Sequence, residues 1–324
     1  ASGGVYDSGD YLAAVQLAEG RLERLQQRQR DVRAAGGLYG IGMAAVVEPS
    51  ISNMGYITTV MTAEERARAG PKGGAVATAT VGVDALGSVS AHVSSVPQGQ
   101  GHETVIAQVV ADGLGLAPEA IAVSTELDTG RDAWSVASGN YSSRFSGAVT
   151  GAAKMATDRL RTRLADIAAA HFGCGSDAVE FAGGTIGVAG AQTKPVPFRR
   201  LGATSHWAQA TLPQGMEPVI RETVFWSPDA LTPPNEADEI NSSAAHGFVF
   251  DVCGVEVERE TGRVRIDDYT TVHDAGTLLH PAMADGQVRG GFANAVGATL
   301  YEHFSYGPDG SFQSGTFADY TVPT

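Results

Sequence analysis

A glycine-rich turn at residues 98–101 lies between strand patterns and a helix pattern. Residues 75–95 alternate Val, Ala and small polar residues, which is typical of β-strands. From 103 to 113 valines recur at helical spacing, and a strand pattern follows at 121–127. The 41 glycines among 324 residues allow many tight turns. This order favours a mixed fold of helices and sheets.

Periodicity and end signals predict three further helices. Ser8 is placed to cap an amphipathic helix that Gly36 ends. Residues 146–171 form a long alanine-rich helix pattern, and Gly173 follows as its expected C-terminal glycine. The last pattern, residues 281–302, begins with a proline at the first helical position.

Strand patterns occupy much of the remaining chain. Residues 38–48 read as a strand, and residues 177–190 as short strands broken by glycine. Two β-rich runs, 248–258 and 264–272, predict a hairpin because Glu-Thr-Gly joins them.

A proline-rich stretch at 227–234 marks the predicted boundary between two lobes. It follows residues 198–212, which have room for a short helix. We therefore predict a lobe over residues 1–230 and another over residues 231–324.

Composition excludes several classes of function. A net charge of −14 and a pI near 4.9 make a phosphate-neutralising surface for nucleic acid improbable. Cys174 and Cys253 are far apart without CxxC spacing, so no zinc or iron–sulfur site is predicted within the chain, and a reduced, cytoplasmic setting is expected. No run approaches the roughly 18 apolar residues of a spanning helix, and the first residues lack a signal-peptide pattern.

The first stretch with chemical content is residues 98–104, Gln-Gly-Gln-Gly-His-Glu-Thr. It follows a strand and opens a helix, so backbone N–H groups and the Thr104 hydroxyl point towards one spot, which suits a phosphate or another electron-rich group. The alternative is a plain glycine turn with Thr104 as a cap. The string is not a dinucleotide-binding fingerprint, because the third glycine and the downstream ribose-binding carboxylate are misplaced. It is not a P-loop either, because Gly-Lys-Ser/Thr is missing.

A second stretch combines Asp-Thr-Gly at 128–130 with Gly-Asn-Tyr-Ser-Ser-Arg at 139–144. Read locally, this is a hydroxyl-rich loop that caps the long helix after Ser146. Hydroxyl groups beside an arginine also suit a pyrophosphate.

A third stretch runs from 272 to 291 and contains Val-His-Asp-Ala-Gly, then His-Pro, then Asp-Gly-Gln-Val-Arg-Gly-Gly. Read locally, the glycines give a helix a small-residue surface, and His280 caps the start of that helix.

These ordered stretches together resemble the molybdenum hydroxylases, the family of xanthine dehydrogenase, aldehyde oxidase and aerobic carbon monoxide dehydrogenase. The 98–104 string is similar to the family's molybdopterin-contacting motif. The resemblance implies an α+β fold with two lobes of mixed sheet and flanking helices, as in the molybdopterin-binding half of the large subunit. The cofactor contacts that it implies are Gln98, Gly99, Gln100, Gly101, Thr104, Thr129, Tyr141, Ser142, Ser143, Asp274, Ala275, His280 and Gln287.

The resemblance also implies the chemistry and the partners. The expected cofactor is molybdopterin, as the cytosine dinucleotide, with molybdenum held only through the pterin. The implied activity is oxidative hydroxylation of a small substrate such as an aldehyde, an N-heterocycle or carbon monoxide. Electrons would then pass to iron–sulfur and flavin subunits. His280 stands where the family usually has Asn.

Two elements of that family's active centre are expected to lie outside this chain. The base glutamate would follow Thr324, and the substrate loop would precede Ala1, in the other half of the molybdenum subunit. The chain therefore contains no predicted catalytic residue, and we expect it to be inactive alone. The alternative is a non-catalytic module that binds molybdopterin or another phosphorylated ligand.

Overall fold

The structure, a computed structural model, describes residues 3–70, 77–130, 134, 139–219 and 221–323. The chain divides into two compact units, each built from separate stretches of sequence. Unit 1 comprises residues 1–7 and 49–246, and unit 2 comprises residues 8–48 and 247–324. The lobe boundary at residue 230 stays a sequence prediction. The mixed helices and sheets confirm the predicted α+β class.

Unit 1 is built on a four-stranded sheet whose order is β4-β3-β2-β8. β2 pairs antiparallel with β3 and β8, whereas β3 and β4 are parallel. All seven residues of β2 are buried, which explains its run of small and β-branched side chains. The strands are β2 (Ala77–Val83), β3 (Val89–Val93), β4 (Ile121–Ser124) and β8 (Arg221–Trp226).

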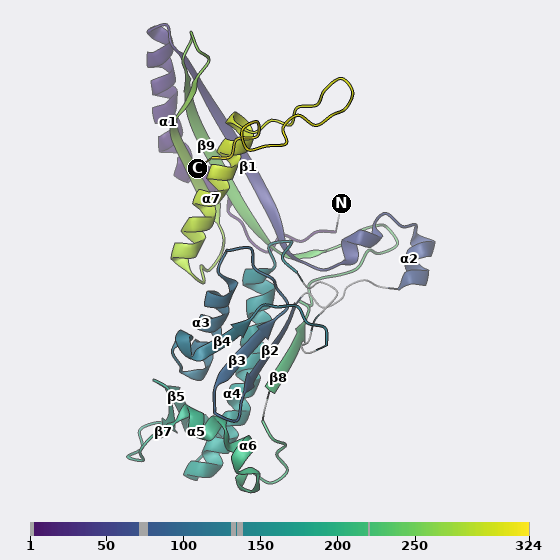
Figure 1. The fold of residues 1–324 in the computed structure, drawn as a ribbon, viewed down its shortest axis with the longest axis vertical. Coiled ribbons are helices and arrows are strands. Elements are labelled where there is room, and N and C mark those ends of the chain that lie inside the picture. Colours follow the sequence, from purple (N-terminus) through teal and green to yellow (C-terminus); the bar gives the residue numbers. More distant parts are fainter. Residues whose placement is uncertain (1–2, 71–76, 131–133, 135–138, 220, 324) are drawn as a thin grey trace. The chain divides into compact units, whose positions relative to one another are not determined.

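Helices α3 (His102–Leu114) and α4 (Thr150–Phe172) pack beside this sheet and against each other (Figure 1). A π-helical turn, η3 (Phe145–Val149), leads directly into α4. The apolar face of α4 includes Leu160 and Leu164, which are fully buried in the main core. The predicted alanine-rich helix and its closing Gly173, with φ of +68°, are confirmed.

The rest of unit 1 consists of short elements. Residues after Met61 include several charged side chains and form helix α2. This helix begins with a reciprocal capping box between Thr62 and Glu65. The predicted helix at 198–212 is divided into three short pieces, α5, α6 and η5. The elements are η1 (Gly55–Thr58), α2 (Ala63–Ala69), η2 (Pro118–Ala120), η4 (Ser176–Ala178), β5 (Val179–Ala182), β6 (Thr185–Val188), β7 (Val196–Pro197), α5 (Phe198–Gly202), α6 (Thr204–Trp207) and η5 (Gln209–Thr211).

Unit 2 holds α1 (Tyr11–Ala34), most of a three-stranded sheet ordered β1-β9-β10, and α7 (Pro281–Leu300). The strands are β1 (Leu38–Ser52), β9 (Ser243–Val257) and β10 (Val264–Asp274). The predicted hairpin is confirmed: β9 and β10 are antiparallel, and Gly262 has a φ of +74°.

Alternation along β9 and β10 divides their side chains between two faces of this sheet. Phe248, Phe250 and Val252 form a small core with apolar residues of α1. Tyr269 pairs with Cys253, and the side chains of this pair lie on the opposite face. The ring centroid of Tyr269 is 4.5 Å from the ring centroid of Phe292 in α7.

The prediction that Ser8 caps the first helix is wrong. The Asp10 carboxylate accepts a hydrogen bond from the Ala13 N–H at 2.9 Å, so α1 begins at Tyr11. Ser8 and Asp10 are both residue types that often cap helices, but Asp10 stands at the correct spacing from Ala13.

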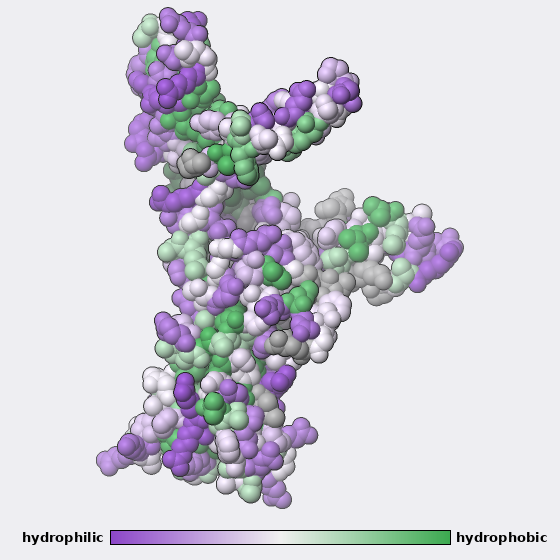
Figure 2. All heavy atoms as spheres, in the orientation of Figure 1, coloured by the Kyte–Doolittle hydropathy of each residue, from purple (hydrophilic) through white to green (hydrophobic). Residues whose placement is uncertain are grey.

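Unit 2 leaves many apolar side chains in contact with solvent. Gly297 is the one buried residue of α7 among those described, and Phe304, Tyr306 and Phe317 in the following segment are more than 60% exposed. Figure 2 shows green, hydrophobic residues interspersed with purple, hydrophilic ones on this segment. Among the described residues, none of the helices has both the length and the apolar character needed to span a bilayer.

Two glycines that end helices of unit 1 provide a matched test of packing. Gly115 and Gly173 are both left-handed C-caps, but a Cβ at Gly115 would lie 2.3 Å from the Phe181 carbonyl carbon, whereas Gly173 faces open space. We expect Gly173→Ala to lower the free energy of unfolding by about 1 kcal/mol. Gly115→Ala should cost at least about twice that, since backbone must shift. Equal losses in urea titrations of the two variants would contradict the packing described here.

Candidate cofactor-binding site

The glycine-rich turn lies between the end of β3 and the start of α3 in unit 1. Gly99 and Gly101 have φ values of +94° and +82°, which side-chain-bearing residues rarely adopt. Gly101 is the N-cap of α3 and supplies no side-chain hydrogen bond to the first turn. The helix therefore presents its first N–H groups, with the partial positive charge of its dipole, beside an exposed Thr104. This geometry suits an anion.

A second loop, residues 139–143, contacts the glycine-rich turn. The Asn140 side-chain amide donates to the Gln98 side-chain oxygen at 3.0 Å, and the Gly139 N–H donates to the Ser94 carbonyl at 3.2 Å. The structure thus brings together two stretches that lie about 40 positions apart in the sequence. Among the predicted contacts, Gln98, Gly99, Gln100, Gly101, Tyr141, Ser142 and Ser143 belong to these two loops.

The second loop has an unusual backbone. Ser142 and Ser143 have positive φ values of 58° and 43°, a conformation that is uncommon for residues other than glycine. Contacts hold it in place: the Ile51 N–H donates to the Ser142 carbonyl at 3.1 Å, and the Tyr141 hydroxyl lies 3.3 Å from the Met54 sulfur. Burial raises the pKa of the Tyr141 hydroxyl, which stays protonated at neutral pH. A loop kept in this conformation is a candidate for ligand binding.

Arg144 and His102 lie beneath these loops, and sequence reasoning did not include them among the cofactor contacts. Arg144 is 1% exposed, with its guanidinium carbon 5.5 Å from the Tyr141 ring centroid. His102 is 2% exposed and stacks on Phe145 with a centroid distance of 3.6 Å, and its Nδ1 lies 3.2 Å from the Ser95 hydroxyl oxygen. The sequence indicated that the arginine beside these hydroxyl groups suits a pyrophosphate, and no acidic residue occurs from 139 to 157 to compensate its charge.

Thr129 is not tied to either loop by the hydrogen bonds described. It is exposed in a short turn, where the Asp128 carboxylate accepts from the Gly130 N–H at 2.9 Å. Most of the segment between this turn and Gly139 falls outside the described residues.

The remaining predicted contacts belong to unit 2 and form its β10-to-α7 connection. The Asp274 carboxylate accepts from the Gly276 N–H at 3.2 Å, which gives a turn that leaves Ala275 exposed. His280 is the N-cap of α7: its Nδ1 accepts from the Met283 N–H at 3.2 Å. His280 therefore has the capping role that its position predicts. Gln287 is exposed on α7.

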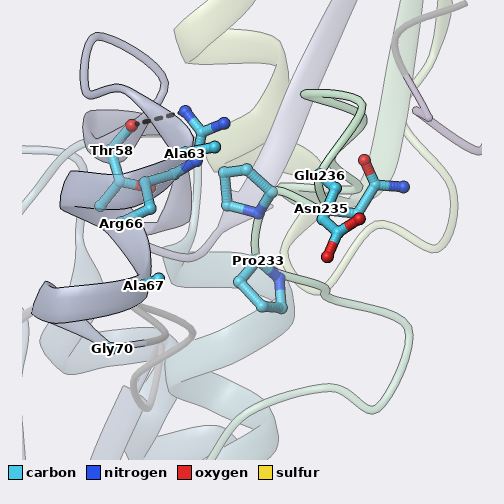
Figure 3. A pocket seen from close by; sticks show the side chains of 9 residues that line it. Thr58, Ala63, Arg66, Ala67, Gly70, Pro233, Asn235 and Glu236 are labelled. Atoms are coloured by element: carbon cyan, nitrogen blue, oxygen red, sulfur yellow. Dashed lines mark hydrogen bonds between the residues drawn. The ribbon is translucent and has the colours of Figure 1, made fainter.

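A separate pocket of about 380 Å³ lies in unit 1 beside α2 and residues 233–236 (Figure 3). Its one arginine, Arg66, donates to the carbonyls of Thr58 and Met61 and forms an ion pair with Asp238. Because its charge is already compensated, we assign Arg66 a structural role. Within the described part of the chain, no group of three or more His, Cys, Asp or Glu side chains is placed to hold a metal ion.

Comparison with known proteins places this chain in a family. Residues 16–324 match the molybdopterin cofactor-binding domain. The chain is 30% identical to the nicotine 6-hydroxylase large subunit of Paenarthrobacter nicotinovorans, over 99% of this chain and 37% of that protein. It is 25% identical to the carbon monoxide dehydrogenase large chain of Hydrogenophaga pseudoflava, over 98% of this chain and 37% of that one.

Solved structures agree. Quinoline 2-oxidoreductase from Pseudomonas putida 86 superposes with a TM-score of 0.76 at 28% identity, covering 98% of this chain and 37% of that one. Carbon monoxide dehydrogenase from Oligotropha carboxidovorans has the same TM-score at 23% identity and shares the fold. The family match and the shared α+β fold thus define a molybdopterin-binding domain. The chain belongs to the molybdenum hydroxylase family and spans 37% of the length of these relatives.

The buried His102 gives a prediction on pH dependence. Burial lowers the pKa of His102 below its ordinary value of 6.5, although the Glu103 charge opposes the shift. The unfolded chain therefore binds the proton more readily, so the stability from neutral His102 is complete above pH 6.5 and falls as the pH drops towards the folded-state pKa. We expect His102→Gln to flatten the decrease in unfolding free energy between pH 7 and 5. His171→Gln, at an exposed position of the same unit, serves as the control; an equally steep decrease in His102→Gln would contradict the assignment.

Proposed function

We propose that the two loops of unit 1 bind the dinucleotide part of a molybdopterin cofactor. The observation that carries the proposal is the hydrogen bond from Asn140 to Gln98, which joins the loop of left-handed serines to the turn that opens α3. Together they offer backbone N–H groups and hydroxyls, the donors that phosphate oxygens accept. The buried Arg144, whose Nε has no hydrogen-bond partner among the described residues, adds a positive charge beneath them.

The residues present fit such a group, and each has a distinct part to play. Ser142, Ser143 and Thr104 would donate hydroxyl hydrogen bonds, and the Gln98 and Gln100 amides would orient the pterin. Thr129 and Tyr141 in unit 1, and Asp274, Ala275, His280 and Gln287 in unit 2, are proposed as further contacts. We propose the cytosine dinucleotide form, which the resemblance of the 98–104 motif supports.

When bound, the molybdenum cofactor supplies the two-electron redox chemistry, and this chain supplies binding and orientation. We propose that the whole protein hydroxylates a small substrate, either an N-heterocycle, an aldehyde or carbon monoxide. The names of the relatives, which refer to nicotine, quinoline and carbon monoxide, support this range. The family match favours this function over a non-catalytic phosphoryl-ligand module.

We further propose a cytoplasmic, multi-subunit enzyme. The relatives include a large subunit, a large chain and a complex subunit, which supports partner polypeptides. We propose that these partners carry iron–sulfur clusters and FAD. Cys174 and Cys253 are free thiols, which supports a reducing compartment.

The test is to measure molybdenum and oxidised fluorescent pterin in the full-length protein, purified with any subunits that accompany it. We expect close to one of each per chain. Gln98→Ala should lower the pterin content about fivefold, the effect of losing roughly one net hydrogen bond. Gln192→Ala, at an exposed position in the β6-to-β7 loop, is the matched control. A wild-type protein that contains neither molybdenum nor pterin would refute the proposed function.

A further inference from the structure

Arg144 is a buried cation with poor compensation. Its side chain makes two long hydrogen bonds, from Nη1 to the Gly139 carbonyl at 3.3 Å and from Nη2 to the Ser94 hydroxyl at 3.4 Å. Both acceptors are neutral, and the Nε has no partner among the described residues. No carboxylate in the described part of the chain forms an ion pair with it.

This environment is costly unless something else compensates the charge. An arginine stays protonated in proteins, and a buried charge is normally paired and fully hydrogen-bonded. Burial lowers the pKa of Arg144, because removing the guanidinium from water disfavours its charged form. A buried cation without a paired carboxylate indicates that an anionic ligand binds nearby.

The position of Arg144 limits where that anion can be. Its two hydrogen bonds connect Gly139, at the start of the 139–143 loop, to Ser94, directly after β3. The preceding residues are Ser142 and Ser143, and the following residue, Phe145, stacks on His102 at the first turn of α3. Arg144 therefore lies beneath both groups of anion-binding donors. Since it is 1% exposed, it acts on a ligand through the loop and through its field.

We infer that Arg144 is a positioning residue for the cofactor: it holds the 139–143 loop against the end of β3 and supplies the buried positive charge that a bound pyrophosphate compensates. This inference rests on the proposed function and adds to it a residue that was not among the predicted contacts. It also explains why two serines keep left-handed backbones, because the loop is held from below while its hydroxyls stay available.

Arg161 provides a matched control in the same unit. Its guanidinium carbon lies 4.5 Å from the Phe181 ring centroid, and its Nη1 donates to the Gly113 carbonyl at 2.6 Å. Arg161 thus makes the same two kinds of contact as Arg144, a stacked ring and a backbone carbonyl. It extends from α4 to the C-terminal end of α3, whereas the candidate site lies at the N-terminal end.

The experiment compares Arg144→Met, Arg144→Lys and Arg161→Met in the full-length holoenzyme. For each variant we measure pterin and molybdenum per chain, the retention of pterin during incubation with inorganic pyrophosphate, and the melting temperature. We expect Arg144→Met to lower pterin content about tenfold, as when one partner of a buried charge pair is removed. Arg144→Lys keeps the charge and should recover part of the loss in pterin content.

The control separates positioning from stability. We expect Arg161→Met to lower the melting temperature while keeping the wild-type pterin content and pyrophosphate resistance. Equal pterin content in Arg144→Met and Arg161→Met would overturn the inference and leave the proposed function intact. If Arg144→Met does not fold, Ser94→Ala takes its place: faster loss of pterin to pyrophosphate supports the inference, and wild-type retention overturns it. A wild-type enzyme without pterin would overturn both proposals.

Discussion

Strand β2 is the element on which the candidate site of unit 1 depends. All seven of its residues are buried, and it pairs on both sides. Just before Ala79, the Thr78 N–H donates to the Ser94 hydroxyl at 2.9 Å, and Ser94 in turn accepts from Arg144. A short chain of contacts therefore connects this fully buried strand to the 139–143 loop. The loop can keep an unfavourable backbone because that connection starts in a packed core.

In this arrangement the regular elements and the turns have different roles. Regular elements supply position, through β3, α3 and the start of α4, and the irregular turns between them supply donors. The glycine-rich turn contributes N–H groups because its left-handed residues have no Cβ, and the second loop contributes hydroxyls. Neither loop contains a carboxylate, so both suit an electron-rich ligand in a chain whose net charge is −14.

The sequence predicted those parts of the fold that local patterns determine. The long α4 helix, the β9–β10 hairpin and the caps at Gly173 and His280 depend on periodicity or on one residue type, and they are present. The interleaving of the two units depends on pairing between residues far apart in sequence, for which no local pattern exists. The same holds for the left-handed Ser142 and Ser143, since propensity favours glycine there and tertiary contacts override it. Arg144 was visible as a residue type, but its burial was not.

The discontinuous make-up of unit 1 has a practical consequence for dissecting the protein. The two ends of its long segment are side by side: the Asn53 N–H donates to the Ser242 carbonyl at 3.0 Å, and the Ser52 and Ser243 hydroxyl oxygens are 2.9 Å apart. Residues 49–246 thus leave and return at one place, like an insertion in a host domain. Cutting the polypeptide at any single position cannot release this segment. Two cuts at neighbouring points can, and a short linker between residues 48 and 247 would then rejoin the host chain.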